Sequence, residues 1–564
     1  MAKKYKALES QNLPACAADF IKLVIRKMRY RKKVRADVQA ELTAHFEDEL
    51  SGSKTDEEKE KRAQQLIAEF GDMKLLAVLL RRAKKRCRPL WRTAVARAFQ
   101  TIGVLILCLI LYCVYISLGK PNIRVNYVDE ALRIARAQVD ESQNAAPFYQ
   151  KAVDAYKEPP LVEDETGRER SLLDVIQKKS WVTELTEEEL TLMKNWLSDN
   201  NDAAGFFKQA AEMPYCWWRR QAENDIVIVI LVPELKNMKN VARLLSWRAM
   251  LNAFNGNIES AFDDLLTCYR TGRHLKGPLS LIEQLVGMAI QGLSSGTATI
   301  ILQNRQVDSE LLKNFQADIE KLMAEDTFIA DYTTERFLAL DFLQRCYTDN
   351  GSGSGHMIPG AVGKFPYFEL GDFDNVVLNY SQFLAMAVVS ADRDDMSREF
   401  EKFYSNAQRW AYKTPWQLHK ENVDLEMGLD KWSRIKRIRY WPVTVLMPAI
   451  GKVGELTYRN KAGIEALVTI VALLRYHQDN GRYPQNLNEL VDTAYIRRLP
   501  MDPYSSQSLC YKKTDDAFIL YSVGLNFKDD GGTVVAVKGK AKVQGTKEQG
   551  DWVFWPVPES SEKK

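Results

Sequence analysis

The sequence predicts a mainly α-helical membrane protein that ends in a small α+β domain. Three observations predict this class: an uncharged apolar segment of transmembrane length, apolar residues at helical spacing through most of the chain, and strand-like segments confined to the C-terminal part. At 564 residues the chain is too long to fold around a single hydrophobic core. We expect a basic cytoplasmic helical domain over residues 1–92 and one transmembrane helix over residues 97–119. An exported, mainly helical region over residues 125–455 and an α+β head over residues 456–558 would follow.

Charge is segregated along this chain. Residues 1–97 hold 24 Lys/Arg and 13 Asp/Glu, a net charge of +11, whereas the remaining residues hold 54 and 61, a net charge of −7. A soluble enzyme has little reason to separate its charges in this way. The pattern therefore indicates that the two parts lie in different environments.

The divider is the segment Ala98–Gly119, whose 22 residues carry no charge and match the length that a helix needs to cross a hydrocarbon core of roughly 30 Å. Eight Lys/Arg lie between residues 81 and 97, but only Lys120 and Arg124 follow the segment before the acids begin. Because positive flanks stay in the cytoplasm, we expect an inside N-terminus and export of the residues after about 120. The alternatives are a buried core helix, disfavoured by the long charge-free run, and a cleaved signal peptide, disfavoured by the late start of the segment.

The cytoplasmic part reads as a group of helices. Residues 18–50 and 56–83 each read as a helix, the first with apolar side chains at near-helical spacing, and Thr55 is a plausible N-cap of the second helix. Gly71 and Asp72 mark a turn before a last helix, Met73–Arg86.

Two strings in this part carry a resemblance. They are ELTAHFEDEL (Glu41–Leu50) and, after a charged linker, AEFGDMKLLAVLL (Ala68–Leu80). Together they resemble the small helical domains, called HAAS signalling or permease prefix domains, at the cytoplasmic N-termini of bacterial membrane proteins. The resemblance covers about 65 residues and implies regulation or protein contact instead of catalysis.

The region from about 125 to 455 is mostly helical in its spacing. Val241–Leu275 predicts two helices joined by a turn at Gly256 and Asn257, and it resembles one tetratricopeptide-type hairpin. Gly277–Leu302 is apolar enough for a second span, but Glu283 and the small polar residues favour a buried core helix.

The sequence holds no recognisable catalytic signature. HExxH, P-loop and Rossmann patterns are absent, and the exported histidines, at positions 274, 356, 419 and 477, are expected to be structural. The eight cysteines follow neither zinc-site nor disulfide-scaffold spacing, although a disulfide between exported cysteines is chemically permitted. Sequence does not reveal the separation of acid pairs, so a hydrolase hidden in the helical middle stays an alternative.

The C-terminal part contains an ordered series of motifs. A predicted helix, Gly463–Gln478, precedes them, and they are Asn480-Gly481-Arg482-Tyr483-Pro484, Leu499-Pro500-x-Asp502-Pro503 and Tyr521-Ser522-x-Gly524. The series resembles the globular head of the type II secretion pseudopilins, the major pseudopilin in particular, over about 90 residues. It implies a helix packed on a short antiparallel sheet. The apolar part of the predicted helix is short and carries Glu465, and nothing resembles a leader peptide, so we do not expect processing and polymerisation as a pilin.

The pseudopilin resemblance also implies a metal site. In that family the loop after the Y-S-x-G strand binds calcium through backbone carbonyls and acidic side chains, and the matching acids are Asp529 and Asp530. Adjacent carboxylates beside a glycine pair suit a hard cation that takes oxygen ligands. The alternative is a solvated turn, because the loop is short and poor in acids.

These features predict a non-enzymatic interaction or signalling protein of the bacterial inner membrane. We expect the lipid bilayer and protein partners on both sides of it, and no nucleic acid. The first alternative function is an accessory component of a type II secretion or pilus-like system, and the second is the exported hydrolase.

Overall fold

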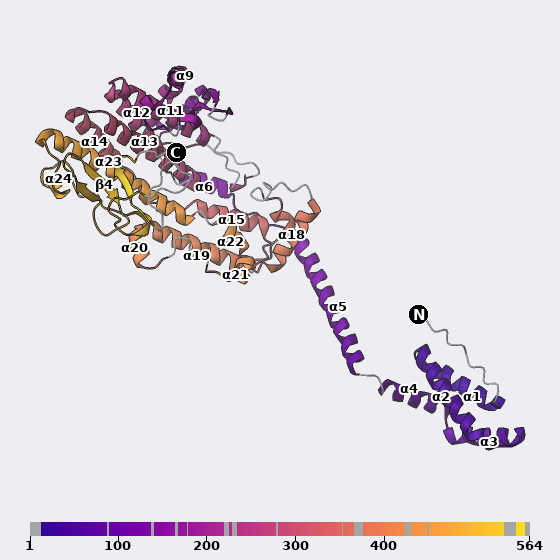
Figure 1. Cartoon of the computed structure of the whole chain (residues 1–564). Helices are drawn as coiled ribbons and strands as arrows, with labels where there is room; N and C mark the ends of the chain where they lie inside the picture. The colour runs from indigo at the N-terminus through magenta and orange to yellow at the C-terminus, as the bar shows by residue number, and fades with distance from the viewer. Residues whose placement is uncertain are drawn as a thin grey trace. The chain divides into compact units, whose positions relative to one another are not determined.

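The computed structural model describes residues 13–86, 90–136, 140–163, 167–176, 179–218, 225–227, 234–277, 280–351, 354–365, 376–423, 429, 431–447, 450–534 and 549–558. The chain forms two compact units, Met1–Tyr112 (unit 1) and Cys113–Lys564 (unit 2). Helix makes up 67% and strand 5%, with a small sheet near the C-terminus, which confirms the mainly α fold class (Figure 1).

Residues 13–86 of unit 1 form a bundle of four helices, namely α1 (Ala15–Lys27), α2 (Lys32–Leu50), α3 (Asp56–Phe70) and α4 (Met73–Arg86). The prediction of one helix over residues 18–50 is wrong, because the chain reverses at Arg29, whose φ is +38°. The reversal lets α1 contact α2 and brings the rings of Phe20 and Phe46 to 6.2 Å. The predicted N-cap is confirmed: the Thr55 side chain accepts a hydrogen bond from the N–H of Glu58.

Two helices are long and apolar enough to cross a membrane among the residues that the structure describes. One lies in α5 (Leu90–Ser117), over Ala94–Ser117, and only 6% of its most apolar window is buried. The other is α13 (Leu281–Asn304), of which 61% is buried in unit 2. The burial of α13 agrees with the core helix expected there, and the exposure of α5 leaves an apolar surface that water does not solvate favourably.

The remaining helices belong to unit 2. They are α6 (Tyr127–Ala135), α7 (Ala146–Ala155), α8 (Leu172–Ile176), α9 (Glu187–Asp199), α10 (Asn201–Ala211), α11 (Glu234–Phe254), α12 (Ile258–Leu275), α14 (Ser309–Ala324), α15 (Glu335–Cys346), α16 (Pro359–Val362), α18 (Val376–Val389), α19 (Arg393–Ala411), α20 (Pro415–Lys420), α21 (Arg434–Arg439), α22 (Trp441–Leu446), α23 (Ile450–Asn480) and α24 (Asn488–Asp492).

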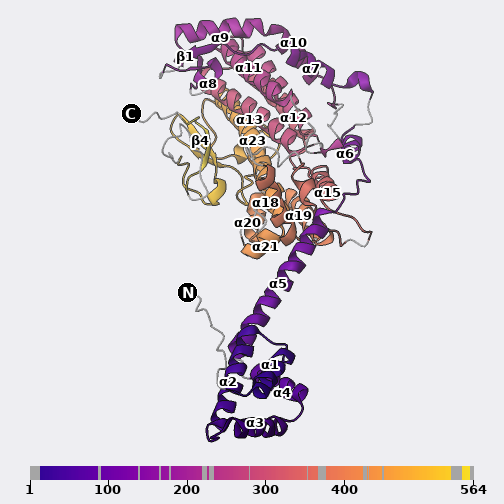
Figure 2. The ribbon, with the colours of Figure 1, turned by 90° about the vertical axis from the view of Figure 1, so that its right-hand side faces the viewer.

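The predicted hairpin is present as α11 and α12. Gly256 has a φ of +89° in the turn between them, a backbone conformation that glycine adopts without strain. Helices α11, α12, α13 and α23 then pack side by side (Figure 2). The backbones of α12 and α13 approach closely, because a Cβ added at Gly272 would lie 2.5 Å from the carbonyl oxygen of Gly287.

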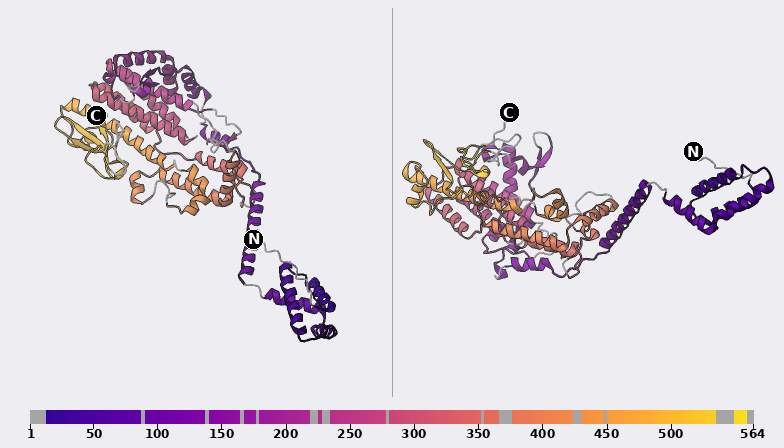
Figure 3. Two further views of the ribbon diagram at one scale, coloured as in Figure 1. Left: turned by 45° about the vertical axis from the view of Figure 1, so that its right-hand side comes forward. Right: turned by 90° about the horizontal axis from the view of Figure 1, so that it is seen from below.

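The C-terminal sheet has the order β3-β4-β5 and is antiparallel, with strands Cys510–Lys513, Phe518–Ser522 and Trp552–Trp555. It packs on α23, as two further views show (Figure 3), and a second, two-stranded sheet joins β1 (Leu161–Glu163) to β2 (Glu169–Ser171). The predicted head helix is longer than expected. It starts at Ile450, and its other sides contact α13 and α14. The head and the helical region therefore share one hydrophobic core.

Candidate functional site

A cleft of about 640 Å³ lies beside α23 in unit 2. It is bounded by the end of α14 and the loop that follows it, by α23, and by residues 496–500. Lys461, Glu465 and Val468 line it together because positions three or four apart lie on one side of a helix. Phe328 adds an aromatic wall. A cleft of this volume is large enough for a small organic ligand.

The charged groups of the cleft differ in how many hydrogen-bond and ion-pair partners they have. Glu465 is buried, and its Oε1 accepts a hydrogen bond of 2.7 Å from Nη2 of Arg498, while its Oε2 has no hydrogen-bond partner. Among the described residues, no carboxylate lies within salt-bridge distance of the Lys461 ammonium, which lies 5.8 Å from the centre of the Phe328 ring. Arg497 and Arg498 also line the cleft, but they pair with Glu320 and Glu465, so Lys461 is the cleft cation without a carboxylate partner among the described residues.

Asp326, which also lines the cleft, is fully engaged. Its Oδ2 accepts hydrogen bonds from Nζ of Lys276 at 2.6 Å and from Nε2 of Gln291 at 2.8 Å. The side chains of both ion-pair partners are almost fully buried. A buried carboxylate of this kind is held by its partners and fixes the loop after α14 against α12 and α13.

A second cavity, of about 610 Å³, lies between α13, α23 and β5. Small residues of both helices line it, among them Gly292 and Gly463. The guanidinium of Arg459 lies over the ring of Trp552, with 4.8 Å to the ring centre, at one wall. Its lining is mainly apolar, so it presents fewer groups that could orient a polar ligand than the cleft beside Lys461 does.

The structure places the predicted metal-binding acids in a loop closed by its own hydrogen bonds. Oδ1 of Asp529 accepts from the hydroxyl of Tyr521 at 2.8 Å and from the N–H of Gly531 at 2.9 Å, and Oδ2 of Asp530 accepts from the amide of Asn526 at 2.8 Å. In the described part of the chain, no group of three or more His, Cys, Asp or Glu side chains is placed to hold a metal. This arrangement does not favour the ion, and the calcium hypothesis stays a prediction.

Two other carboxylates of the head are buried, which the motifs did not reveal. Oδ1 of Asp502 accepts from the Ser522 hydroxyl at 2.8 Å, and its Oδ2 accepts from the N–H of Val523 at 3.0 Å. Oδ2 of Asp551 accepts from the N–H of Gly532 at 2.7 Å. Burial raises the pKa of both carboxyls. They tie the turns of the head to its sheet.

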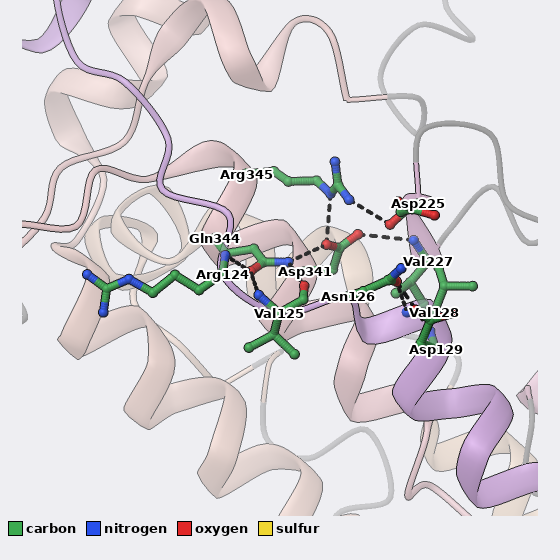
Figure 4. Close-up of polar contacts among 10 residues, drawn as sticks. All are labelled: Arg124, Val125, Asn126, Val128, Asp129, Asp225, Val227, Asp341, Gln344 and Arg345. Carbon is green, nitrogen blue, oxygen red and sulfur yellow. Dashed lines mark hydrogen bonds and ion pairs between the residues drawn. The ribbon is translucent and has the colours of Figure 1, made fainter.

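A side-chain amide holds the segment that follows α5 (Figure 4). Oε1 of Gln344 in α15 accepts from the N–H groups of Arg124 and Val125 at 3.2 and 3.3 Å, and its Nε2 donates to the carbonyl of Val125 at 2.8 Å. The amide therefore pairs with the backbone as a neighbouring strand would.

The Asp341 carboxylate holds the Gln344 side chain in this orientation. It is fully buried, its Oδ1 accepts from Nε2 of Gln344 at 2.9 Å and from Nε of Arg345 at 2.7 Å, and its Oδ2 accepts from the N–H of Val227 at 3.0 Å (Figure 4). Every partner is a donor, so the buried charge is compensated and the Gln344 amide is oriented.

The last turn of α5 is itself part of the core of unit 2. Ile116 is fully buried in a cluster with residues of α15, α18 and α19. Gly119 lies so close to its neighbours that an added Cβ would lie 2.7 Å from Cγ2 of Thr348 and 2.9 Å from Nε2 of His356. The end of the long apolar helix is thus packed into unit 2.

In the described part of the chain, no pair of acids with raised pKa lines either cavity. Burial raises the pKa of Asp264, Glu335, Asp502 and Asp551, and none of these carboxyls lines the two cavities described above. Each accepts hydrogen bonds that hold local structure. Among the described residues, the cysteines at positions 16, 108, 113, 268, 346 and 510 are free, and Cys87 lies outside the described part.

No family model, curated protein or solved structure matches this chain. The resemblances to the helical signalling domains and to the pseudopilin head therefore rest on the motifs quoted above and stay predictions.

Proposed function

We propose that this protein is a membrane-anchored, non-enzymatic binding and signalling protein. In this proposal α5 crosses the bacterial inner membrane, residues 1–92 are cytoplasmic and the residues after about 120 are exported. The charge-free run of α5, its exposure and the cations that precede it support the orientation.

The observation that carries the proposal is the junction between α5 and unit 2. Ile116 is buried in the unit 2 core, and the Gln344 amide is hydrogen-bonded to the backbone N–H and carbonyl of Val125. A flexible linker would isolate the anchor from the attached domain. A packed junction instead links any rearrangement of unit 2 to the helix that crosses the membrane.

The cleft beside Lys461 is the proposed ligand site. Its apolar and aromatic wall and its cation without an acidic partner suit an organic anion with an apolar part. Because α23 belongs both to the cleft and to the head, and also contacts α13, occupation of the cleft would bias the packing of both parts of unit 2.

Cross-linked co-purification of the full-length protein from its native membranes tests this function. The Lys461→Gln variant removes the positive charge of Lys461 from the cleft, and Lys452→Gln, at an exposed lysine of the same helix, is the matched control. We expect a cytoplasmic regulator bound through residues 1–92 with all three proteins, and an exported-side partner or ligand that only Lys461→Gln loses. Identical recoveries on the exported side would contradict the role of the cleft.

The secretion accessory is the second candidate function. The antiparallel sheet packed on α23 is the layout that the pseudopilin-like motifs imply, and this layout favours the candidate. Secretion-channel or pilin subunits among the cross-linked partners would place it first. No observation in the described residues favours the hydrolase, since the carboxyls with raised pKa lie outside the cavities.

A further inference from the structure

Helix α21 presents an outward face that combines exposed apolar and cationic side chains. Its six residues, Arg434–Arg439, read RIKRIR. Ile435 and Ile438 are three positions apart and share one side of the helix, and Arg434 and Arg437 share the adjacent side. Ile435 is 79% exposed and Ile438 is 55% exposed, and both arginines are exposed.

Contacts with α19 fix this orientation. Nζ of Lys436, on the side opposite the isoleucines, pairs with Glu399 at 3.1 Å, and Nη2 of the exposed Arg439 pairs with Asp395 at 3.1 Å. The carbonyl of Arg439 also accepts from the N–H of Ala391 at 2.9 Å. The isoleucines are thus held outward by contacts behind them.

The position of α21 in unit 2 connects it with the end of α5. Ile116, from the last turn of α5, shares its core cluster with Ala387 of α18 and with Trp441, which follows α21. Nε1 of Trp441 donates to the Ser390 hydroxyl at 2.9 Å, so α18 and the end of α21 are joined. Within unit 2, Figure 2 draws α18 and α21 towards one end and β1 and α9 at the other.

We propose that the outward face of α21, formed by Arg434, Ile435, Arg437 and Ile438, docks on the surface of the bilayer that α5 crosses. The isoleucines would enter the boundary of the acyl chains, and the arginines would meet anionic headgroups, as in helices that lie in a membrane interface. Trp432, whose ring lies 4.1 Å from Nζ of Lys436, adds an aromatic side chain of the kind enriched at that depth. The inference rests on the proposed anchoring by α5.

The occupant is argued from continuity with the anchor. If α5 crosses the bilayer, its last turn ends at the level of the headgroups, and Ile116 in that turn is fully buried in the cluster that carries α18 and Trp441. In this topology the α21 face would lie near lipid. A soluble protein partner on this face is an outcome that the test can detect.

The test is photo-cross-linking of the full-length protein in a bilayer of phosphatidylglycerol and phosphatidylcholine. A diazirine analogue of leucine replaces Ile435 in one protein, Leu161 in β1 in a second and Leu107 in the middle of α5 in a third, and adducts are identified by mass spectrometry. All three side chains are exposed in the structure, at 79%, 66% and 55%. We expect several-fold more lipid adduct at position 435 than at position 161.

The controls separate this inference from the proposed anchoring. Lipid adducts at position 107 but not at 435 would overturn the docking surface and leave the anchor in place. An absence of lipid adducts at position 107 would overturn the anchor, and with it the basis for docking. In native membranes, adducts from position 435 to a protein instead of lipid would also overturn the inference.

A charge variant tests the role of the arginines. The lipid adducts of position 435 should be richer in phosphatidylglycerol than the bilayer itself, and the excess should disappear in the Arg434→Gln, Arg437→Gln variant. Lys452→Gln, which changes an exposed lysine of α23, is the matched control and should keep the excess. Equal headgroup composition in the wild type and the bilayer would overturn the part assigned to the arginines.

Discussion

At the scale of single residues, the polar side chains of unit 2 act mainly by fixing local geometry. His274 is the clearest case. It is partly buried, its Nε2 lies 3.0 Å from the carbonyl oxygen of Met213, and its Nδ1 lies 2.9 Å from the hydroxyl of Tyr149. A carbonyl only accepts, so Nε2 carries the proton of a neutral ring. Burial lowers the pKa of His274 to about 4.

Because the pKa of His274 is lowered, we predict that the protein loses stability in acid. The pKa of His274 in the folded protein is about 4 against an ordinary value of 6.5, so the contribution of the neutral ring to stability is complete above pH 6.5 and disappears as pH falls towards 4. The expected loss in the free energy of unfolding is roughly 3 kcal/mol. Denaturant unfolding of the full-length protein at several pH values measures it.

The matching variants isolate the effect of His274. His274→Gln should be less stable than the wild type at pH 7 but should lose less stability on acidification. His477→Gln, at a histidine of α23, is the control for removing an imidazole. A wild-type pH slope in His274→Gln would contradict the prediction.

The acidic loop gives a second prediction at this scale. If calcium binds through Asp529 and Asp530, added calcium should raise the melting temperature of the full-length protein, because a ligand that binds only the folded state stabilises it. Chelation should reverse the rise, and an Asp529→Ala, Asp530→Ala variant should not respond. Identical melting of the two proteins across a calcium titration would remove the metal hypothesis and leave the hydrogen-bonded turn that the structure contains.

At the scale of elements, local signals gave the limits of several helices. Met73–Arg86 forms the predicted helix, and Thr55 caps α3 as expected, because capping depends on residues within one turn. The break at Arg29 and the early start of α23 at Ile450 were missed. Both depend on contacts distant in sequence, namely between α1 and α2 and between α23 and the helices around it.

The crossing of α12 and α13 predicts opposite effects for two glycines of one helix. An added Cβ at Gly287 would meet the carbonyl of Gly272 and lie 3.0 Å from Cγ of Lys276, whereas nothing lies within 4 Å of an added Cβ at Gly296. Gly287→Ala should lower the free energy of unfolding by roughly 1–3 kcal/mol through overpacking. Gly296→Ala should leave it unchanged or raise it by up to about 1 kcal/mol, because alanine favours helix. Chemical denaturation compares them, and equal effects would contradict the close crossing.

The junction after α5 predicts a change in local protection. Gln344→Met keeps the side-chain volume but removes the hydrogen bonds to Arg124 and Val125. Since one hydrogen bond contributes about 1 kcal/mol, amide exchange of these residues should quicken by roughly tenfold. Hydrogen–deuterium exchange with mass spectrometry measures it, with Gln382→Met, at an exposed position of α18, as control. Unchanged exchange would show that Gln344 does not hold this segment.

At the scale of the whole molecule, the two units differ in charge and are separated within α5. The proposed topology predicts that protease added to spheroplasts digests unit 2 and leaves an N-terminal fragment that ends near residue 119. The fragment should become sensitive only after lysis. Digestion of an N-terminal tag in intact spheroplasts would contradict the proposed orientation and indicate the opposite one.

Charge variants test why the protein takes this orientation. Cations within about 15–20 residues of a span set its direction, so replacing the nearby group with glutamine should reduce the protected fraction. The nearby group is Arg81, Arg82, Lys84, Lys85 and Arg86, and a distant control group of equal charge is Lys22, Arg26, Lys27, Arg29 and Arg31. The control should keep the full protected fraction, and an equal loss in both variants would point to a general folding defect.

The sequence by itself determined the helical character of the chain, the position of its uncharged apolar segment and the helical hairpin over Val241–Leu275, because period, charge and turn residues are local properties. Only the tertiary structure decided that the head and the helical region share one core, that Lys461 lines a cleft, and that Gln344 grips the segment after α5. These contacts join residues up to hundreds of positions apart. Which such residues meet depends on the packing of whole helices, and no local pattern encodes that packing.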